Sequence, residues 1–201
     1  MSNPTTYTVG VVMDHIASIN IKKDSSFAMM LEAQRRGCPL YHMLQGDLWI
    51  DNGVVYARMQ PVRVYDNAQH WYDLGEAIVK PLHELSVVLM RKDPPFDMEY
   101  IYSTYLLEMA EKQGTLVVNR PASIRAANEK LFATWFPQYC PATRVTRDMG
   151  LIKAFLAEQQ HIVVKPLDGM GGSMIFQIKQ GDANTNVILE TITHFGKRTV
   201  M

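Results

Sequence analysis

Residues 7–13 read Tyr-Thr-Val-Gly-Val-Val-Met, a short apolar run rich in β-branched side chains. A run without alternating polar positions is typical of a strand buried on both faces of a parallel sheet. Asp24, Ser25 and Ser26 offer N-cap residues for a helix that ends near Gly37, and residues 39–44 read as the next strand. This order predicts a β-α-β unit, which decides the fold of the N-terminal half.

Two further apolar runs extend the predicted sheet. Residues 85–90 and 115–118 read as core strands, with a helix over residues 98–113 between them. Asn52-Gly53 lies between two apolar runs and predicts a β-hairpin, because both residue types accept positive φ. We therefore predict an open, doubly wound α/β sheet of about 120 residues.

The pattern changes after Pro121. Ser123 is a candidate cap for one continuous helix that Pro137 ends. The apolar face of that helix would comprise Ile124, Ala127, Leu131 and Trp135. We therefore place a domain boundary after Ala122, which divides the chain into residues 1–122 and 123–201.

The second half is predicted to contain further strands. Residues 142–146 read as a strand and residues 151–159 as a helix. Residues 162–165 and 173–178 read as strands joined by a short loop, which favours an antiparallel hairpin. Residues 197–201 resemble the start of another strand that no turn closes, so we expect the sequence to be cut short.

The loop between the last two strands is the strongest local candidate for a binding site. Residues 168–173 read Asp-Gly-Met-Gly-Gly-Ser, and Lys165 precedes them. Closely spaced glycines let backbone N–H groups turn toward one point, which suits phosphate oxygens. The lysine precedes the glycines, so this is not a Walker A motif. On the glycines alone, a flexible hairpin stays the alternative.

Lys130 is a weaker candidate. On the predicted helix it lies about 140° from the apolar face. A solvated surface lysine is the commoner interpretation of such a position.

Two loops leave the carboxyl ends of predicted strands, at residues 14–24 and 91–95. The carboxyl ends of parallel strands meet at one edge, where open α/β sheets bind ligands. A joint binding crevice is one interpretation, and a pair of rigid surface turns is the other. The candidate residues are Asp14, Asn20, Arg91, Lys92 and Asp93.

Composition excludes several classes. The 201 residues include 20 Lys and Arg and 20 Asp and Glu, and this zero net charge argues against nucleic acid or an anionic membrane as partner. No apolar run approaches the roughly 20 residues of a membrane span and no secretory signal is present, so we expect a cytoplasmic protein. Two cysteines form no disulfide framework, and six histidines show no zinc-site spacing.

Four separated blocks of the sequence resemble bacterial glutathione synthetase, a family of ATP-grasp ligases. The resemblance extends from about Tyr7 to Met201, and its blocks are residues 12–29, 89–97, 128–132 and 165–172. It implies a Rossmann-like pre-ATP-grasp N-terminal domain followed by the small α+β lobe of an ATP-grasp fold, with the C-terminal lobe missing. The chain would then be the N-terminal two-thirds of such a protein.

The resemblance also implies a function. The full-length enzyme would join γ-glutamylcysteine to glycine through an acyl phosphate, with ATP and Mg²⁺, giving glutathione. The implied ATP-binding residues are Lys130, Lys165, Gly169, Met170, Gly171, Gly172 and Ser173. The metal ligands and catalytic residues would lie in the missing part, so this chain alone is expected to be inactive.

The resemblance further suggests small-molecule substrates and a homo-oligomer such as a tetramer. Two alternatives stay open. One is another ATP-grasp ligase for amino acids or peptides. The other is a non-catalytic nucleotide-binding module.

Overall fold

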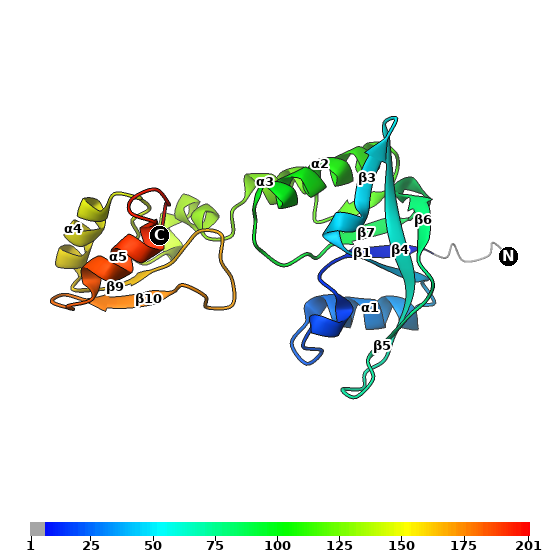
Figure 1. The fold of residues 1–201 in the computed structure, drawn as a ribbon, viewed down its shortest axis with the longest axis horizontal. Coiled ribbons are helices and arrows are strands. Elements are labelled where there is room, and N and C mark those ends of the chain that lie inside the picture. The colour runs from blue at the N-terminus through cyan, green and yellow to red at the C-terminus, as the bar shows by residue number, and fades with distance from the viewer. Residues whose placement is uncertain (1–6) are drawn as a thin grey trace. The chain divides into compact units, whose positions relative to one another are not determined.

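The computed structural model describes residues 7–201, which form two compact units (Figure 1). The first unit comprises the described residues up to Asp93 together with Met98–Arg125, and the second comprises Pro94–Asp97 and Ala126–Met201. Each unit has its own hydrophobic core. The boundary after Ala122 stays a prediction.

The first unit is built on an eight-stranded sheet. Its main strand order is β3-β4-β2-β1-β7-β8, and β5 and β6 both pair with β4. β1 is parallel to β2 and to β7, and β7 is parallel to β8, as the apolar runs predict. The strands are β1 Val9–Val12, β2 Leu40–Met43, β3 Leu48–Asp51, β4 Val54–Val64, β5 Tyr72–Leu74, β6 Ile78–Pro81, β7 Val87–Met90 and β8 Leu116–Val118.

Helices α1 (Ser25–Arg35) and α2 (Met98–Lys112) lie on opposite sides of the parallel strands (Figure 1). Successive side chains of a strand point to opposite faces, so alternate residues of β1 face each helix. Val9 and Val11 belong to the core cluster that contains Phe27 and Met30 of α1. The doubly wound α/β arrangement is therefore confirmed.

The residues predicted to cap the first helix and to form the hairpin turn do so in the structure. The Asp24 carboxylate accepts a hydrogen bond from the Phe27 N–H at 2.7 Å, which caps α1. Gly37, just after that helix, has a φ of +78°. Asn52 and Gly53 have φ values of +46° and +83° and join β3 to β4 as a tight hairpin.

The second unit packs two helices against one face of a two-stranded antiparallel sheet. β9 (His161–Val164) pairs with β10 (Phe176–Lys179), which confirms the predicted hairpin. α4 (Met149–Gln159) and α5 (Thr185–Thr193) cover the sheet (Figure 1), and α5 was not predicted. The core side chains include Ile152, Leu156, Ile162, Val164, Ile178, Leu189 and Ile192.

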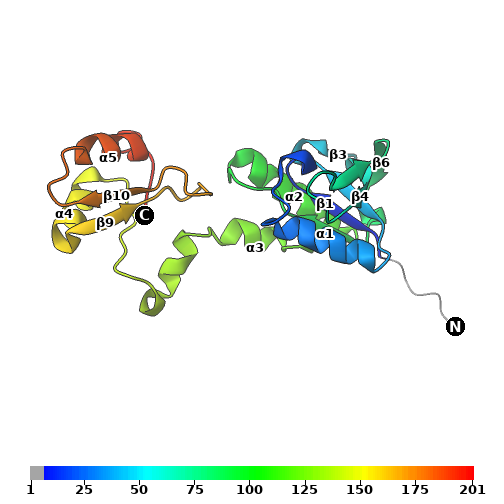
Figure 2. The same cartoon turned by 90° about the horizontal axis from the view of Figure 1, so that it is seen from below.

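The continuous helix predicted over residues 123–136 is wrong. Helix α3 (Pro121–Ala126) ends early, and short 3₁₀ turns over Leu131–Trp135 and Pro137–Tyr139 follow it separately (Figure 2). The side-chain oxygen of Asn128 causes the break, because it accepts hydrogen bonds from the next backbone N–H groups in place of helical carbonyls.

Lys130 therefore lies at a turn and not on a helix. Because Lys130 is not helical, its predicted angle to the apolar face does not place it in solvent, and its side chain is only 13% exposed. Trp135, predicted on a buried helix face, is instead largely exposed.

The strand predicted over residues 142–146 is also wrong. A single bridge joins Thr146 to Val200, with both backbone hydrogen bonds at 3.0 Å. The chain enters α4 directly after this bridge, because the Asp148 carboxylate caps that helix and accepts from the Leu151 N–H at 3.0 Å. Val200 is buried in the core of the second unit.

Replacing Asp24 by alanine tests the cap of α1. Asp24→Ala leaves the Phe27 N–H without its acceptor, so we expect the first unit to lose about 1 kcal/mol of unfolding free energy. Asp24→Asn retains an oxygen acceptor and is the matched control. Denaturant unfolding monitored by circular dichroism measures both variants, and equal losses in the two would contradict the assignment.

Candidate functional site

The glycine loop connects β9 to β10 in the second unit. Gly171 and Gly172 have φ values of +64° and +79°, which place them in the left-handed region that favours glycine. The Ser173 N–H closes a turn on the Met170 carbonyl at 3.1 Å, and residues 170–173 are exposed. The backbone N–H groups of residues 169–172 make no hydrogen bond to any residue in the described range. They are available to an anion.

Lys130 lies against the start of this loop. Its ammonium donates to the Gly169 carbonyl and forms an ion pair with Glu129. The two stretches predicted to share a ligand, residues 128–132 and 165–173, are therefore adjacent in the folded chain. A role for Lys130 in binding ATP stays a prediction.

Lys165 stands at the end of β9. Its backbone pairs with Met201, with hydrogen bonds of 2.9 and 3.0 Å. Within residues 7–201, its ammonium makes neither a hydrogen bond nor an ion pair with another side chain. Lys165 therefore contributes a positive charge that the described part of the chain does not neutralise.

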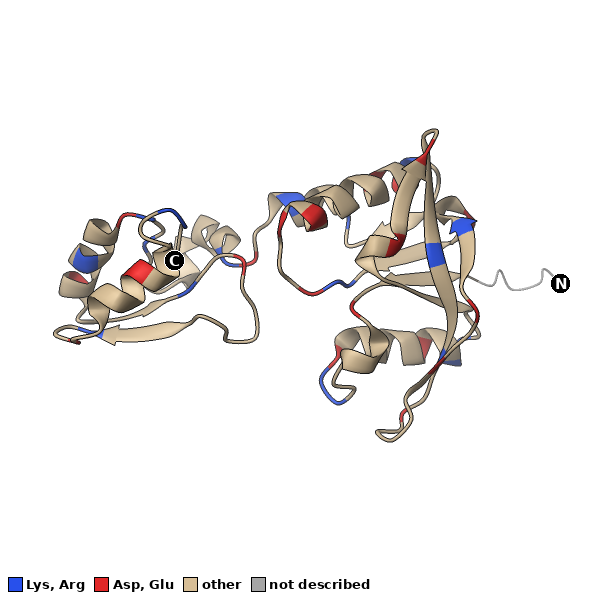
Figure 3. Ribbon diagram, viewed as in Figure 1, with Lys and Arg blue, Asp and Glu red and all other residues tan. Residues whose placement is uncertain are grey.

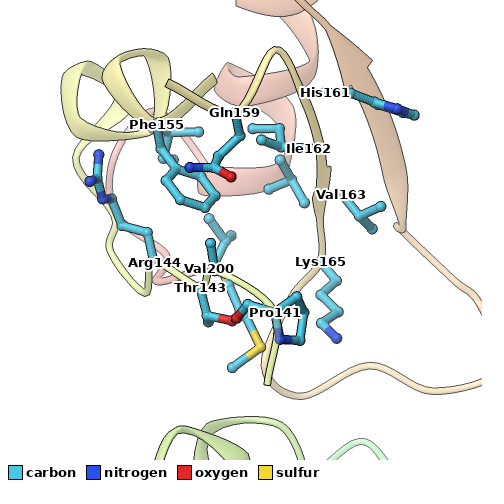
Figure 4. A pocket seen from close by; sticks show the side chains of 14 residues that line it. Pro141, Thr143, Arg144, Phe155, Gln159, His161, Ile162, Val163, Lys165 and Val200 are labelled. Atoms are coloured by element: carbon cyan, nitrogen blue, oxygen red, sulfur yellow. The ribbon is translucent and has the colours of Figure 1, made fainter. Parts of the chain in front are cut away.

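A pocket of about 320 Å³ lies beside Lys165 (Figure 4). Phe155, Ile162 and Val200 contribute apolar surface to it. Lys165 lies at one end of the pocket, beside Pro141. Such a cavity suits a largely apolar group with a negatively charged substituent at the lysine end. Sequence reasoning missed this pocket, because its lining comes from four separated segments that carry no shared motif.

The predicted crevice residues of the first unit meet at the carboxyl ends of β1 and β7. The Lys92 ammonium pairs with the Asp14 carboxylate at 2.9 Å. The other oxygen of that carboxylate accepts from the Asp93 N–H at 3.1 Å. Asp14, Lys92 and Asp93 are therefore in contact, as the parallel topology predicts.

Arg91 and Asn20 make different contacts. The Arg91 guanidinium donates to the hydroxyls of Ser25 and Ser26, both at 2.9 Å, and so joins β7 to the start of α1. The Asn20 side chain accepts from the Lys22 N–H at 3.2 Å and shapes its own loop. Ligand binding by any of these residues stays a prediction.

His42 is a buried residue at this edge that sequence reasoning passed over. Only 3% of it is exposed, and its Nε2–H donates to the Asp14 carbonyl at 3.2 Å. Burial lowers the pKa of the His42 imidazole, and the Asp14 carbonyl opposes that shift. Its place on a predicted strand was the available signal, because alternate strand residues face the core.

Charge is spread over both units. Lys and Arg are interspersed with Asp and Glu in both units (Figure 3). Among residues 7–201, no three His, Cys, Asp or Glu side chains converge as metal ligands. In the same range, no helix has the length and apolarity needed to cross a membrane.

The fold is similar to part of a solved ATP-grasp protein. The structure resembles that of a RimK domain ATP-grasp protein from Sphaerobacter thermophilus, with a TM-score of 0.58 and 20% sequence identity. The likeness covers 96% of this chain and 61% of that one. At this identity the comparison defines the fold alone.

The sequence defines the family within that class. Residues 7–125 match the prokaryotic glutathione synthetase N-terminal domain, and residues 129–201 match the ATP-grasp domain of the same family. The chain belongs to the prokaryotic glutathione synthetase family. It is 57% identical to glutathione synthetase of Shewanella oneidensis and 55% identical to that of Pseudomonas aeruginosa, over 193 residues in each case. These matches cover 96% of this chain and 61% of the length of each relative.

The His42 environment predicts a pH dependence of stability. Because the folded protein lowers the pKa of His42 below 6.5, the unfolded chain binds more protons as the pH falls through that value. Stability should therefore decline below about pH 6.5, by at most about 1.4 kcal/mol per pH unit from this group.

Unfolding at pH 7.5 and 5.5 measures the effect. His42→Gln should reduce the difference in stability between the two pH values, because glutamine does not titrate. His83→Gln replaces an exposed histidine and is the control. A pH difference equal to that of the wild type in His42→Gln would refute the assignment.

Proposed function

We propose that the full-length protein is an ATP-dependent ligase that joins γ-glutamylcysteine to glycine and forms glutathione. In this proposal, residues 1–122 form the N-terminal domain and residues 123–201 the small ATP-grasp lobe. The observation that carries the proposal is the contact of Lys130 with the glycine loop. This loop follows Lys165, whose ammonium has no partner among residues 7–201. Family membership supports the choice of reaction.

The described groups suit ATP. The pocket beside Lys165 would hold the adenine ring, and the lysine would direct the phosphates toward the glycine loop. Gly169 to Ser173 would fold over the phosphates. The backbone N–H groups of residues 169–172, which make no hydrogen bond within residues 7–201, would point at the phosphate oxygens. Each charge-assisted hydrogen bond would contribute about 1.5–3 kcal/mol.

The proposed reaction has two steps. The cysteinyl carboxylate attacks the γ-phosphorus of ATP, which forms an acyl phosphate and releases ADP. The glycine amine then attacks the acyl carbon, which forms the amide and releases phosphate and a proton. The lysines would neutralise charge on the transferring phosphoryl group and hold it in line, which are the main needs of phosphoryl transfer.

In this proposal, Mg²⁺ would balance the negative charge of the ATP phosphates. The described residues do not offer it a set of three converging ligands. We propose that its carboxylate ligands belong to a part of the full-length protein outside residues 7–201.

The edge of the first unit has a proposed supporting role. Asp14, Lys92 and Asp93 hold one another in place, and Arg91 fixes the start of α1. We propose that these residues and Asn20 contact the peptide substrate or a neighbouring domain. Cytoplasmic location and assembly into a homo-oligomer such as a tetramer also stay proposals.

Lys165→Ala tests the nucleotide site. In the full-length enzyme we expect turnover to fall by about 10²-fold or more, because one preorganised positive donor is lost. Lys179→Ala removes an exposed lysine from β10, at the other end of the hairpin, and should keep wild-type kinetics. ADP release with γ-glutamylcysteine and glycine gives the rate. Unchanged kinetics in Lys165→Ala would exclude the proposed role.

The isolated chain provides a second test. We expect the purified 201 residues to form no glutathione from ATP, γ-glutamylcysteine and glycine, because they span 61% of the length of the related enzymes. Chromatographic detection of glutathione is the measurement, with the full-length protein as positive control. Glutathione formed by the isolated chain at a comparable rate would show that the proposed division of labour is wrong.

A further inference from the structure

Asn128 makes hydrogen bonds in two directions. Its side-chain oxygen accepts from the backbone N–H groups of Lys130 at 3.0 Å and Leu131 at 2.9 Å. Its side-chain N–H₂ donates to the Leu167 carbonyl at 3.0 Å. One amide therefore joins the turn that carries Lys130 to the beginning of the glycine loop.

These bonds determine where the Lys130 ammonium can reach. The turn at Asn128 ends the helical path after Ala126 and points the chain toward the loop. Leu167, the tethered residue, lies two positions before Gly169, whose carbonyl accepts from the Lys130 ammonium. The tether adds to that contact, so the lysine and the loop have less conformational freedom to lose on ligand binding than they would have without it.

A backbone bridge between Pro166 and Val200 and one ion pair also hold this end of the loop. Arg198 forms an ion pair with Asp168, but both side chains are partly exposed, at 28% and 46%. Salt and water weaken such a pair. Residues 170–173, by contrast, are exposed and lack a comparable tether to the described chain. The loop therefore has a fixed first half and a free second half.

We propose that Asn128 is a positioning residue that sets Lys130 and the glycine loop in register for the phosphates of the nucleotide. This inference rests on the proposed function, since it assigns Asn128 to the same nucleotide site. Asn128 would not touch the ligand. It would act through the lysine and the loop on either side of it.

The amide of Asn128 accepts hydrogen bonds within the turn and donates one to the loop, and substitutions can remove one of these functions without the other. Asparagine both accepts and donates, whereas an aspartate accepts only. Asn128→Asp therefore keeps an acceptor for the Lys130 N–H and loses the donor to Leu167. Asn128→Ser supplies a second variant, because its hydroxyl can cap the turn but is too short to reach the loop.

The experiment compares ligands that differ in their phosphates. Calorimetric titration of the full-length protein with ATP, ADP and adenosine measures how each variant binds. We expect Asn128→Asp and Asn128→Ser to weaken ATP and ADP by about 10-fold, the equivalent of one hydrogen bond, and adenosine by less than about twofold. Asn184→Asp makes the same chemical change at an exposed position of the second unit and should bind all three ligands as the wild type does.

Two outcomes would overturn the role of Asn128 and leave the proposed function intact. ATP affinity within about twofold of the wild type in a folded Asn128 variant would show that the tether does not matter. Equal weakening of ATP and adenosine would show a general structural role instead of phosphate positioning. If the wild-type protein bound no ATP, the proposed function would fail, and the role of Asn128 would fail with it.

Discussion

The parallel pairing of β1 on both of its sides is the constraint on which the first unit depends. β2 and β7 both run parallel to β1, so all three strands end at the same edge. Asp14 and Lys92 are far apart in sequence, yet each follows one of these strands, and their side chains meet there. In such a sheet, the parallel topology alone brings a residue that follows a strand to this edge.

The sequence predicted the first unit well because its signals are local. Apolar β-branched runs, the cap at Asp24 and the Asn52-Gly53 turn each involve a few neighbouring residues, and all three match the structure. The parallel topology predicted correctly that Asp14, Lys92 and Asp93 lie close together at one edge of the sheet. Arg91 and Asn20 made other contacts, because side-chain reach depends on the path of each loop and not on topology.

The second unit was harder to predict because its decisive interactions are non-local. Helix-like spacing continued past Ala126, yet the side chain of Asn128 outcompeted the helical carbonyls. The pocket beside Lys165 draws on four segments and has no linear signature. Local sequence patterns did not predict that Lys130 lies against the loop. Only the resemblance to a family placed the two in one site.

The ammonium groups of Lys92, Lys130 and Lys165 differ in a way that bears on where a ligand would bind. Lys92 is paired with Asp14, and that pair already satisfies the carboxylate at the sheet edge. Lys130 donates to a neutral carbonyl and pairs with an exposed Glu129, a partner that water and salt screen. Lys165 has no partner among residues 7–201 and stands at an apolar pocket. At the second unit an incoming polyphosphate would compete with the exposed Glu129 for Lys130, whereas at the first it would compete with the less exposed Asp14 for Lys92. That difference supports the proposal that the glycine loop is the anion site.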